Sequence, residues 1–345
     1  MKNFIFISCI LIILFKTGNV FSDNNIFNVN NIEINKKISK NKEKLVNIAF
    51  EKAYDELITR LLLKEDYKKF SKIDLIQIKK LISYYQISNL DENSIKKISV
   101  NVFFDKERMH NFFYNRNILY SDIMNTEISL FPLLKKENQY FVYSKNFFYE
   151  NWNNFNFDNF IEYTLPLENI ENIQKINQNK NNIFDLDISS FFKEQESLNQ
   201  IFAIIEINGN ISEVFLTTKI EGKKIFKTIV IEKNDFEEKD YYKKIIFEID
   251  TVIKDLIKSQ NLIDVKTPSF LNVEVKLDDK SNLVEFTNRI KKIDLIDNFY
   301  VQELNKEYVL VKIKYLGKIN KIISKLKNQN INLKMTNGQW QLNII

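Results

Sequence analysis

The chain has 345 residues, enough for two or three compact units, because single hydrophobic cores stop growing near about 250–300 residues. Lys and Arg number 50 and Asp and Glu number 45, which gives a net charge of +5. With 44% hydrophobic and 28% charged residues, the composition excludes a disordered acidic or basic tail. Lysines and acids are interspersed, without an arginine-rich stripe, so we expect no nucleic-acid partner.

The first 22 residues have the pattern of a signal peptide. A short positive start precedes an unbroken apolar run from Phe4 to Phe15, which is too short to cross a bilayer core of about 30 Å comfortably. We predict cleavage between Ser22 and Asp23, and thus a periplasmic mature chain without a membrane span. If the segment stays uncleaved, it anchors the chain in the inner membrane with the remainder facing the periplasm.

Residues 23–137 are predicted to form an N-terminal α+β domain. Apolar residues recur at a spacing of four along residues 41–64, which indicates a helix with one broad apolar face. A second helix is predicted to begin at Asp105, whose carboxylate suits an N-cap. Strands are predicted at residues 26–34, 81–87, 98–104 and 128–134. The order β-α-β-β-α-β predicts one small sheet covered by helices.

The next block starts with an aromatic and asparagine-rich connection, residues 138–165, that contains Trp152 and keeps no single period. Residues 166–265 are predicted to form a middle α+β meander domain. Its strands are expected on either side of Gly209 and Gly222, since glycine provides the positive φ of tight hairpins. The strands are predicted at residues 201–207, 211–218 and 224–231, and the helices at residues 187–198 and 239–260.

The last block, residues 269–345, has the clearest alternation. It predicts the order βαββαβ plus one strand, which is that of a ferredoxin-like domain. The final hairpin turns at Asn337-Gly338, a strong two-residue turn signal. The expected fold class is therefore α+β and multidomain, with small sheets each covered by helices.

Motifs for covalent chemistry are lacking. Cys9 lies within the apolar leader and His110 is the one histidine, which excludes zinc clusters of His and Cys, a CxxC pair and haem attachment. The sequence has no glycine-rich phosphate loop and no GxSxG elbow. We therefore expect no cofactor, no metal and no catalytic residue, and we interpret His110 as a surface or half-buried structural residue.

Carboxylates leave one alternative open, because a glycosidase needs only two acids about 5–10 Å apart. The candidate pairs fall at predicted turns or element ends, where caps and solvated charges are expected. The acid-rich stretch from Asp235 to Asp240 lacks the glycine-containing calcium loop. The candidate pairs are Asp185/Asp187, Glu237/Glu238 and Asp278/Asp279.

Three segments resemble the uncharacterised bacterial envelope family called domain of unknown function 2066. These are the helix at residues 49–62, the strand and helix at residues 98–113 and the region around Trp152, followed by the C-terminal βαββαβ order. The most specific piece is VNVFFD, from Val100 to Asp105. The resemblance implies an envelope protein and no catalytic residue.

The sequence thus predicts an exported, non-enzymatic accessory or scaffold protein of the cell envelope. It would act by binding an envelope protein or a cell-wall component through a sheet edge or a groove. The alternative is a carboxylate-based hydrolase of envelope polysaccharide.

Overall fold

The computed structural model describes residues 25–70, 73–88, 97–123, 126–155, 161–193, 197–276, 281–305, 307–336 and 338–344. The predicted signal peptide with its cleavage site at Ser22 and Asp23 lies outside these residues, as do the pair Asp278/Asp279 and Asn337. No helix among the described residues is both long enough and apolar enough to cross a membrane.

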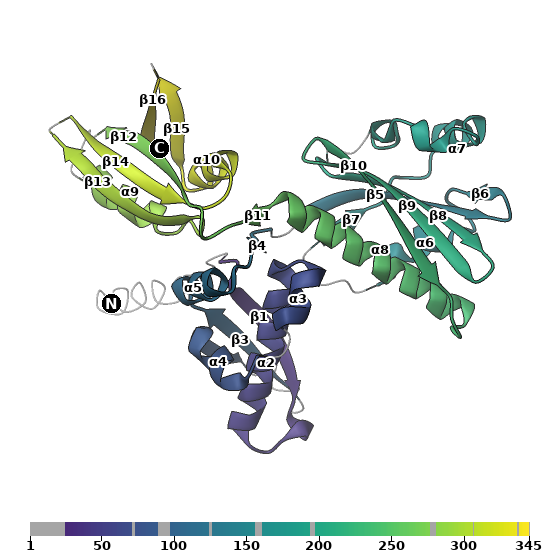
Figure 1. The fold of residues 1–345 in the computed structure, drawn as a ribbon, viewed down its shortest axis with the longest axis horizontal. Coiled ribbons are helices and arrows are strands. Elements are labelled where there is room, and N and C mark those ends of the chain that lie inside the picture. Colours follow the sequence, from purple (N-terminus) through teal and green to yellow (C-terminus); the bar gives the residue numbers. More distant parts are fainter. Residues whose placement is uncertain are drawn as a thin grey trace, which may run out of the picture. The chain divides into compact units, whose positions relative to one another are not determined.

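The chain divides into two compact units, and each is assembled from separate stretches of sequence. Figure 1 shows the elements, coloured along the sequence. Unit 1 draws on Met1–Ala53, Leu75–Arg116 and Asp264–Ile345, and unit 2 on Tyr54–Asp74 and Asn117–Ile263.

Unit 1 contains an antiparallel three-stranded sheet of order β1-β3-β2. The predicted capping role of Asp105 is confirmed, because its Oδ1 accepts the backbone N–H of Arg108 at 2.9 Å. The strands are β1 (Asn28–Asn35), β2 (Ile82–Ser88) and β3 (Lys97–Phe104), and the associated helical elements are η2 (Lys36–Ile38), α2 (Lys42–Leu61), α4 (Leu75–Leu81) and α5 (Lys106–Arg116). Helix α2 continues into unit 2 from Tyr54.

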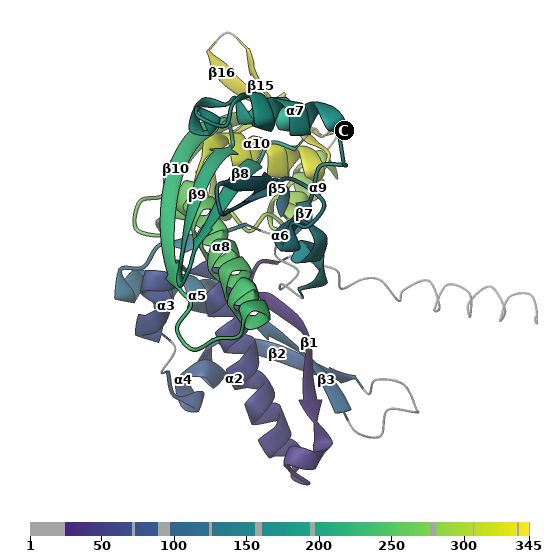
Figure 2. The ribbon, with the colours of Figure 1, turned by 90° about the vertical axis from the view of Figure 1, so that its right-hand side faces the viewer.

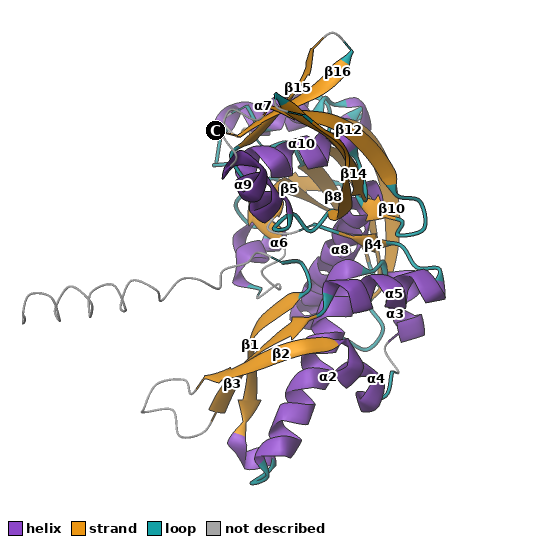
Figure 3. Ribbon diagram, turned by 90° about the vertical axis from the view of Figure 1, so that its left-hand side faces the viewer, coloured by secondary structure: helices purple, strands orange, loops and turns teal. Residues whose placement is uncertain are grey.

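The C-terminal part of unit 1 has the predicted ferredoxin-like element order. The last strand is inserted beside the first, parallel to it, so the sheet order is β13-β14-β12-β16-β15. Helices α9 and α10 cover one face of this sheet (Figure 3). The elements are β12 (Ser269–Lys276), α9 (Ser281–Ile290), β13 (Ile296–Leu304), β14 (Tyr308–Tyr315), α10 (Ile319–Asn328), β15 (Ile331–Thr336) and β16 (Gln339–Ile344).

Unit 2 is built on a six-stranded sheet of order β10-β9-β8-β5-β6, in which β7 also pairs with β5. Glycines at both hairpin turns have positive φ, 60° at Gly209 and 81° at Gly222, as predicted. The strands are β5 (Thr126–Lys136), β6 (Gln139–Phe141), β7 (Ile161–Thr164), β8 (Gln200–Asn208), β9 (Ile211–Ile220) and β10 (Lys223–Glu232). Two short strands, β4 (Tyr120–Ser121) and β11 (Leu262–Ile263), pair separately.

Helices cover both faces of this sheet, with α8 on one face and α7 on the other (Figure 1). Each covered face has its own apolar cluster. One cluster contains Ile245 and Ile249 of α8, and the other contains Ile176 of α7. The helical elements are α3 (Lys64–Phe70), α6 (Phe147–Asn151), η3 (Trp152–Asn154), α7 (Ile170–Gln178), η4 (Ile183–Asp185), η5 (Ile188–Phe191) and α8 (Glu238–Gln260).

Three sequence-based expectations were wrong. The strand at residues 128–134 does not join the first sheet; within β5 it pairs in parallel with β7 and β8 of unit 2. Of the predicted helix at residues 187–198, the described residues form only the short η5, and α7 was not predicted. The connection at residues 138–165 contributes β6, α6, η3 and β7 to unit 2, and its Trp152 is fully buried.

Candidate functional site

A hollow of unit 2 lies along α8, where the end of α2 and the helix α3 face it. Its volume is about 460 Å³, which is within the usual range for ligand-sized pockets. The lining residues of α8 follow helical spacing on one face. The hollow is lined by Thr59, Leu62, Lys64, Tyr67, Phe247, Asp250, Thr251, Lys254, Asp255 and Lys258.

Lys258 lines this hollow and is buried, with 4% of its surface exposed. Its Nζ donates to the carbonyl oxygens of Thr59 at 2.6 Å and Leu62 at 2.8 Å. These carbonyls lie at the C-terminal end of α2, where the helix dipole favours a cation. Lys258 therefore joins α2 to α8 by satisfying carbonyls that the helix leaves unpaired.

Asp250 is buried one turn away from Lys254. Its carboxylate pairs with Lys254 Nζ at 2.8 Å and accepts a hydrogen bond from the Tyr163 hydroxyl, also at 2.8 Å. A buried carboxylate is stable only when such partners replace water. Asp250 is thus held as an ion-paired structural group.

Contacts of α3 with α8 and α2 hold the helices around the hollow. The backbone N–H of Lys64 donates to Asp255 Oδ1 at 3.1 Å, and Lys64 Nζ lies 3.3 Å from Glu248 Oε2. The Tyr67 hydroxyl donates to Asp55 at 2.6 Å, and this hydrogen bond, with burial, raises the pKa of Tyr67.

A second hollow of about 460 Å³ shares Lys64 and Asp255 with the first. Apolar side chains and lysine stems line most of it, including Val252 and Leu256 of α8 and Lys227 of β10. The two hollows together give the α3 side of α8 a recessed apolar surface with charged edges.

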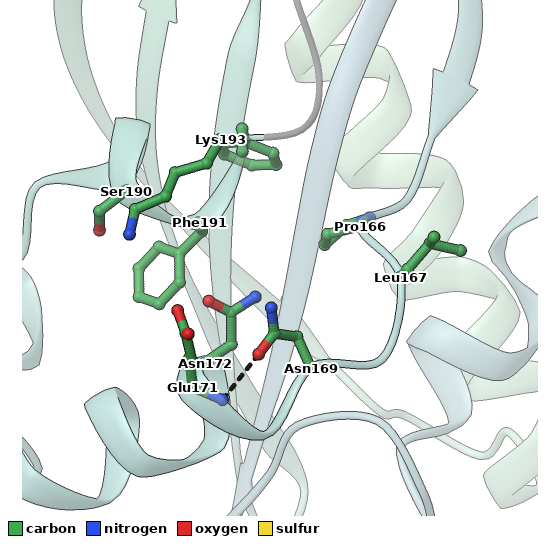
Figure 4. A pocket seen from close by; sticks show the side chains of 9 residues that line it. Pro166, Leu167, Asn169, Glu171, Asn172, Ser190, Phe191 and Lys193 are labelled. Atoms are coloured by element: carbon green, nitrogen blue, oxygen red, sulfur yellow. Dashed lines mark hydrogen bonds between the residues drawn. The ribbon is translucent and has the colours of Figure 1, made fainter.

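A smaller hollow of about 230 Å³ lies at the start of α7 (Figure 4). Asn169 and Asn172 face Ser190 and Lys193 across it. Asn169 caps α7 by accepting the N–H of Glu171 at 2.7 Å, and Asn172 donates to the Tyr143 hydroxyl at 3.0 Å. The two asparagines therefore cap α7 and hold its first turn against Tyr143.

Of the carboxylate pairs suggested by the sequence, the two that the structure describes, Asp185/Asp187 and Glu237/Glu238, are not among the residues that line the hollows beside α8. Asp185 and Asp187 are exposed, and Asp187 caps η5 by accepting the N–H of Ser189 at 3.1 Å. Glu238 begins α8, and hydrogen bonds from Tyr242 and Lys136 lower its pKa.

In the acid-rich stretch, Asp240 pairs with Lys243 at 2.7 Å. Within the described residues, no group of three or more His, Cys, Asp or Glu side chains is arranged to hold a metal ion.

The sequence analysis did not identify the charged residues of the α8 hollow. It predicted the helix from its apolar stripe, and the charged residues lie beside that stripe. Asp250, Lys254 and Lys258 follow each other at a spacing of four, so they occupy one row of α8. A row of charges beside an apolar stripe is ordinarily solvated. Here α2 and α3 cover it, and that contact is not encoded in the local pattern.

Comparisons with known proteins gave no match: no family model, no curated protein and no solved structure is similar to the chain. The resemblance to the domain of unknown function 2066 therefore stays a prediction.

His110 is more deeply buried than expected for a surface residue. It is 8% exposed on α5 and meets the Phe27 ring edge to face at 5.6 Å. Burial, and secondarily the charge of Lys106, lowers the pKa of His110 to about 4 from the ordinary 6.5, although Asp297 opposes this shift.

We expect unit 1 to lose stability as the pH falls from about 6.5 to 4. In that window the unfolded chain binds a proton at His110 that the folded chain does not. The free energy of unfolding therefore falls as the pH falls in this window and is not reduced by His110 above pH 6.5. The loss should be about 2 kcal/mol by pH 5. NMR titration of this single imidazole should give a pKa near 4. Replacement His110→Gln should flatten this part of the pH dependence, and a measured pKa near 6.5 would contradict the expectation.

Proposed function

We propose that the chain is an exported accessory or scaffold protein of the cell envelope that acts by binding a protein or cell-wall partner. The observation that supports this proposal is the recessed apolar surface beside α8. Phe247, which is 62% exposed, lines the first hollow. An exposed aromatic side chain beside a hollow is typical of a surface that receives a partner's side chain.

The charges of the first hollow favour binding over hydrolysis. A carboxylate pair for sugar hydrolysis needs one acid held protonated while the other stays ionised. Both carboxylates that line the hollow are already engaged as acceptors, Asp250 by Lys254 and Tyr163 and Asp255 by the N–H of Lys64. A protein segment that inserts an apolar side chain fits this surface best.

Replacement Phe247→Asp should reduce partner capture at least about tenfold, because it places an unpaired charge where an apolar contact is expected. Crosslinking in the native host followed by purification measures the capture. The matched control is Phe236→Asp, which alters another exposed phenylalanine of unit 2 that does not line the hollow.

Capture of an envelope component that Phe247→Asp abolishes and Phe236→Asp preserves supports the proposal. Equal capture by both variants, or degradation of peptidoglycan by the purified chain, contradicts it. Mass spectrometry of the N-terminus tests export with cleavage: Asp23 as the first residue agrees with it, and an intact Met1 does not.

A further inference from the structure

Strand β10 forms one margin of the six-stranded sheet (Figure 2). It pairs with β9 along its whole length, from Lys223 to Glu232. No other strand of the described residues pairs with its far side. A strand edge of this length offers backbone hydrogen bonds to another strand.

The hairpin geometry shows which backbone groups β10 presents at its free edge. The turn Glu221-Gly222 has φ values of 47° and 81°, and such a two-residue turn closes on a hydrogen-bonded pair, here Ile220 and Lys223. Hydrogen-bonded pairs alternate along an antiparallel ladder. The bond from Lys233 N–H to the Asn210 carbonyl, at 2.8 Å, continues the same alternation. Odd-numbered residues therefore bond to β9, and even-numbered residues direct their backbone groups outward.

The even-numbered side chains share the face of β10 that is opposite α8. The other face carries Ile229 and Ile231, which pack against the cluster that includes α8. Phe226 and Val230 are 62% and 61% exposed. Along the outer face the order is Lys224, Phe226, Thr228, Val230 and Glu232.

Two copies of β10 that run antiparallel can place complementary side chains of this row opposite each other. If two copies of β10 meet with Thr228 opposite Thr228, then Lys224 of each copy lies opposite Glu232 of the other, and Phe226 lies opposite Val230. Opposite charges, aromatic with β-branched side chains, and Thr with Thr are the cross-strand pairs that stabilise antiparallel sheets, each by about 0.2–1 kcal/mol.

We propose that two copies of this chain associate through β10, about a two-fold axis at Thr228, to form one continuous sheet. The interface is isologous, as in most dimers. A shift of two residues in either direction removes both Lys–Glu pairs, and a shift of one residue places paired side chains on opposite faces. Side-chain complementarity thus selects this register.

On the α8 side, where Lys227 also lines the second hollow with residues of α3, the same register sets two further cross-strand pairs. Ile225 meets Ile231 of the other copy, and the aliphatic stem of Lys227 can lie against Ile229. The Glu232 carbonyl already accepts a hydrogen bond from Lys244 Nζ at 2.9 Å. The two outermost pairs, Lys224 with Glu232 of the other copy in each direction, therefore stabilise the dimer through their side chains. The backbone hydrogen bonds between the copies come from Phe226, Thr228 and Val230.

Cysteine substitution tests the position of the axis. In a chain carrying Cys9→Ser, Thr228→Cys should form an intermolecular disulfide, because paired α-carbons about 5.5 Å apart fall within the range for disulfides. The control Lys224→Cys changes an equally exposed residue of β10. Its two copies would be separated by about 26 Å in this register and should not crosslink.

Charge exchange tests the register through the dimer dissociation constant, measured by sedimentation equilibrium. Lys224→Glu or Glu232→Lys alone replaces two attractive pairs by two repulsive ones and should weaken the dimer about tenfold or more. The double variant restores both pairs and should recover the original affinity.

A chain that remains monomeric at all concentrations overturns this inference, as does a dimer that none of these substitutions affects. The inference goes beyond the proposed function. Its failure would leave the Phe247 capture experiment unchanged, since Phe247 does not lie on β10.

Discussion

Replacement Trp152→Ala is expected to destabilise unit 2 by about 3–5 kcal/mol, the usual cost of deleting a large buried aromatic side chain. The Trp152 side chain is fully buried and lies against Tyr163 edge to face at 5.5 Å. It shares a cluster with Phe148. A loss of this size is a large fraction of a typical domain stability.

Urea unfolding followed by circular dichroism measures this loss. The control is Trp340→Ala, because Trp340 is only partly buried on β16 of unit 1. The chain has two tryptophans, so fluorescence of either variant reports on one unit. A loss below about 1 kcal/mol for Trp152→Ala would show that the six-stranded unit does not depend on this side chain.

Replacement Asp250→Ala is expected to cost about 3–5 kcal/mol, since breaking a buried pair removes the carboxylate that lies against the Lys254 charge. Asp250 is 2% exposed and pairs with Lys254 at 2.8 Å. The double replacement Asp250→Ala with Lys254→Met should cost less than Asp250→Ala alone, because neither charge of the pair then remains.

Unfolding in urea of Asp250→Ala, of Lys254→Met and of the double variant gives the coupling energy of this pair. The exposed pair Asp240 and Lys243 provides the comparison, and Asp240→Ala should leave stability nearly unchanged. Additive costs for Asp250 and Lys254 would mean that the buried pair is not energetically coupled.

Local periodicity predicted most elements of the fold, since apolar spacing and glycine turns determine helices and hairpins within a short window. It did not predict the sheet to which a strand belongs. In β5 seven consecutive residues, Ile128 to Leu134, are buried, as in strands covered on both faces. Burial on both faces follows from the place of β5 in a sheet between two helical layers, which depends on partners that are distant in the sequence.

The candidate site was less predictable, because it depends on contacts between distant segments. The bonds from Lys258 to Thr59 and Leu62 join residues nearly 200 positions apart. A lysine in the last turn of a helix is usually a solvated charge near its own C-terminus. Its use as a cap for a different helix has no local signature.

The interleaved division of the chain has a consequence for how the protein is made. Because unit 1 includes residues 264–345 as well as two earlier stretches, a ribosome must release nearly the whole chain before unit 1 can be completed. The last stretch of unit 2 ends at Ile263, so that unit can close first. Pulse-labelled nascent chains should therefore acquire protease resistance from the middle of the sequence outward.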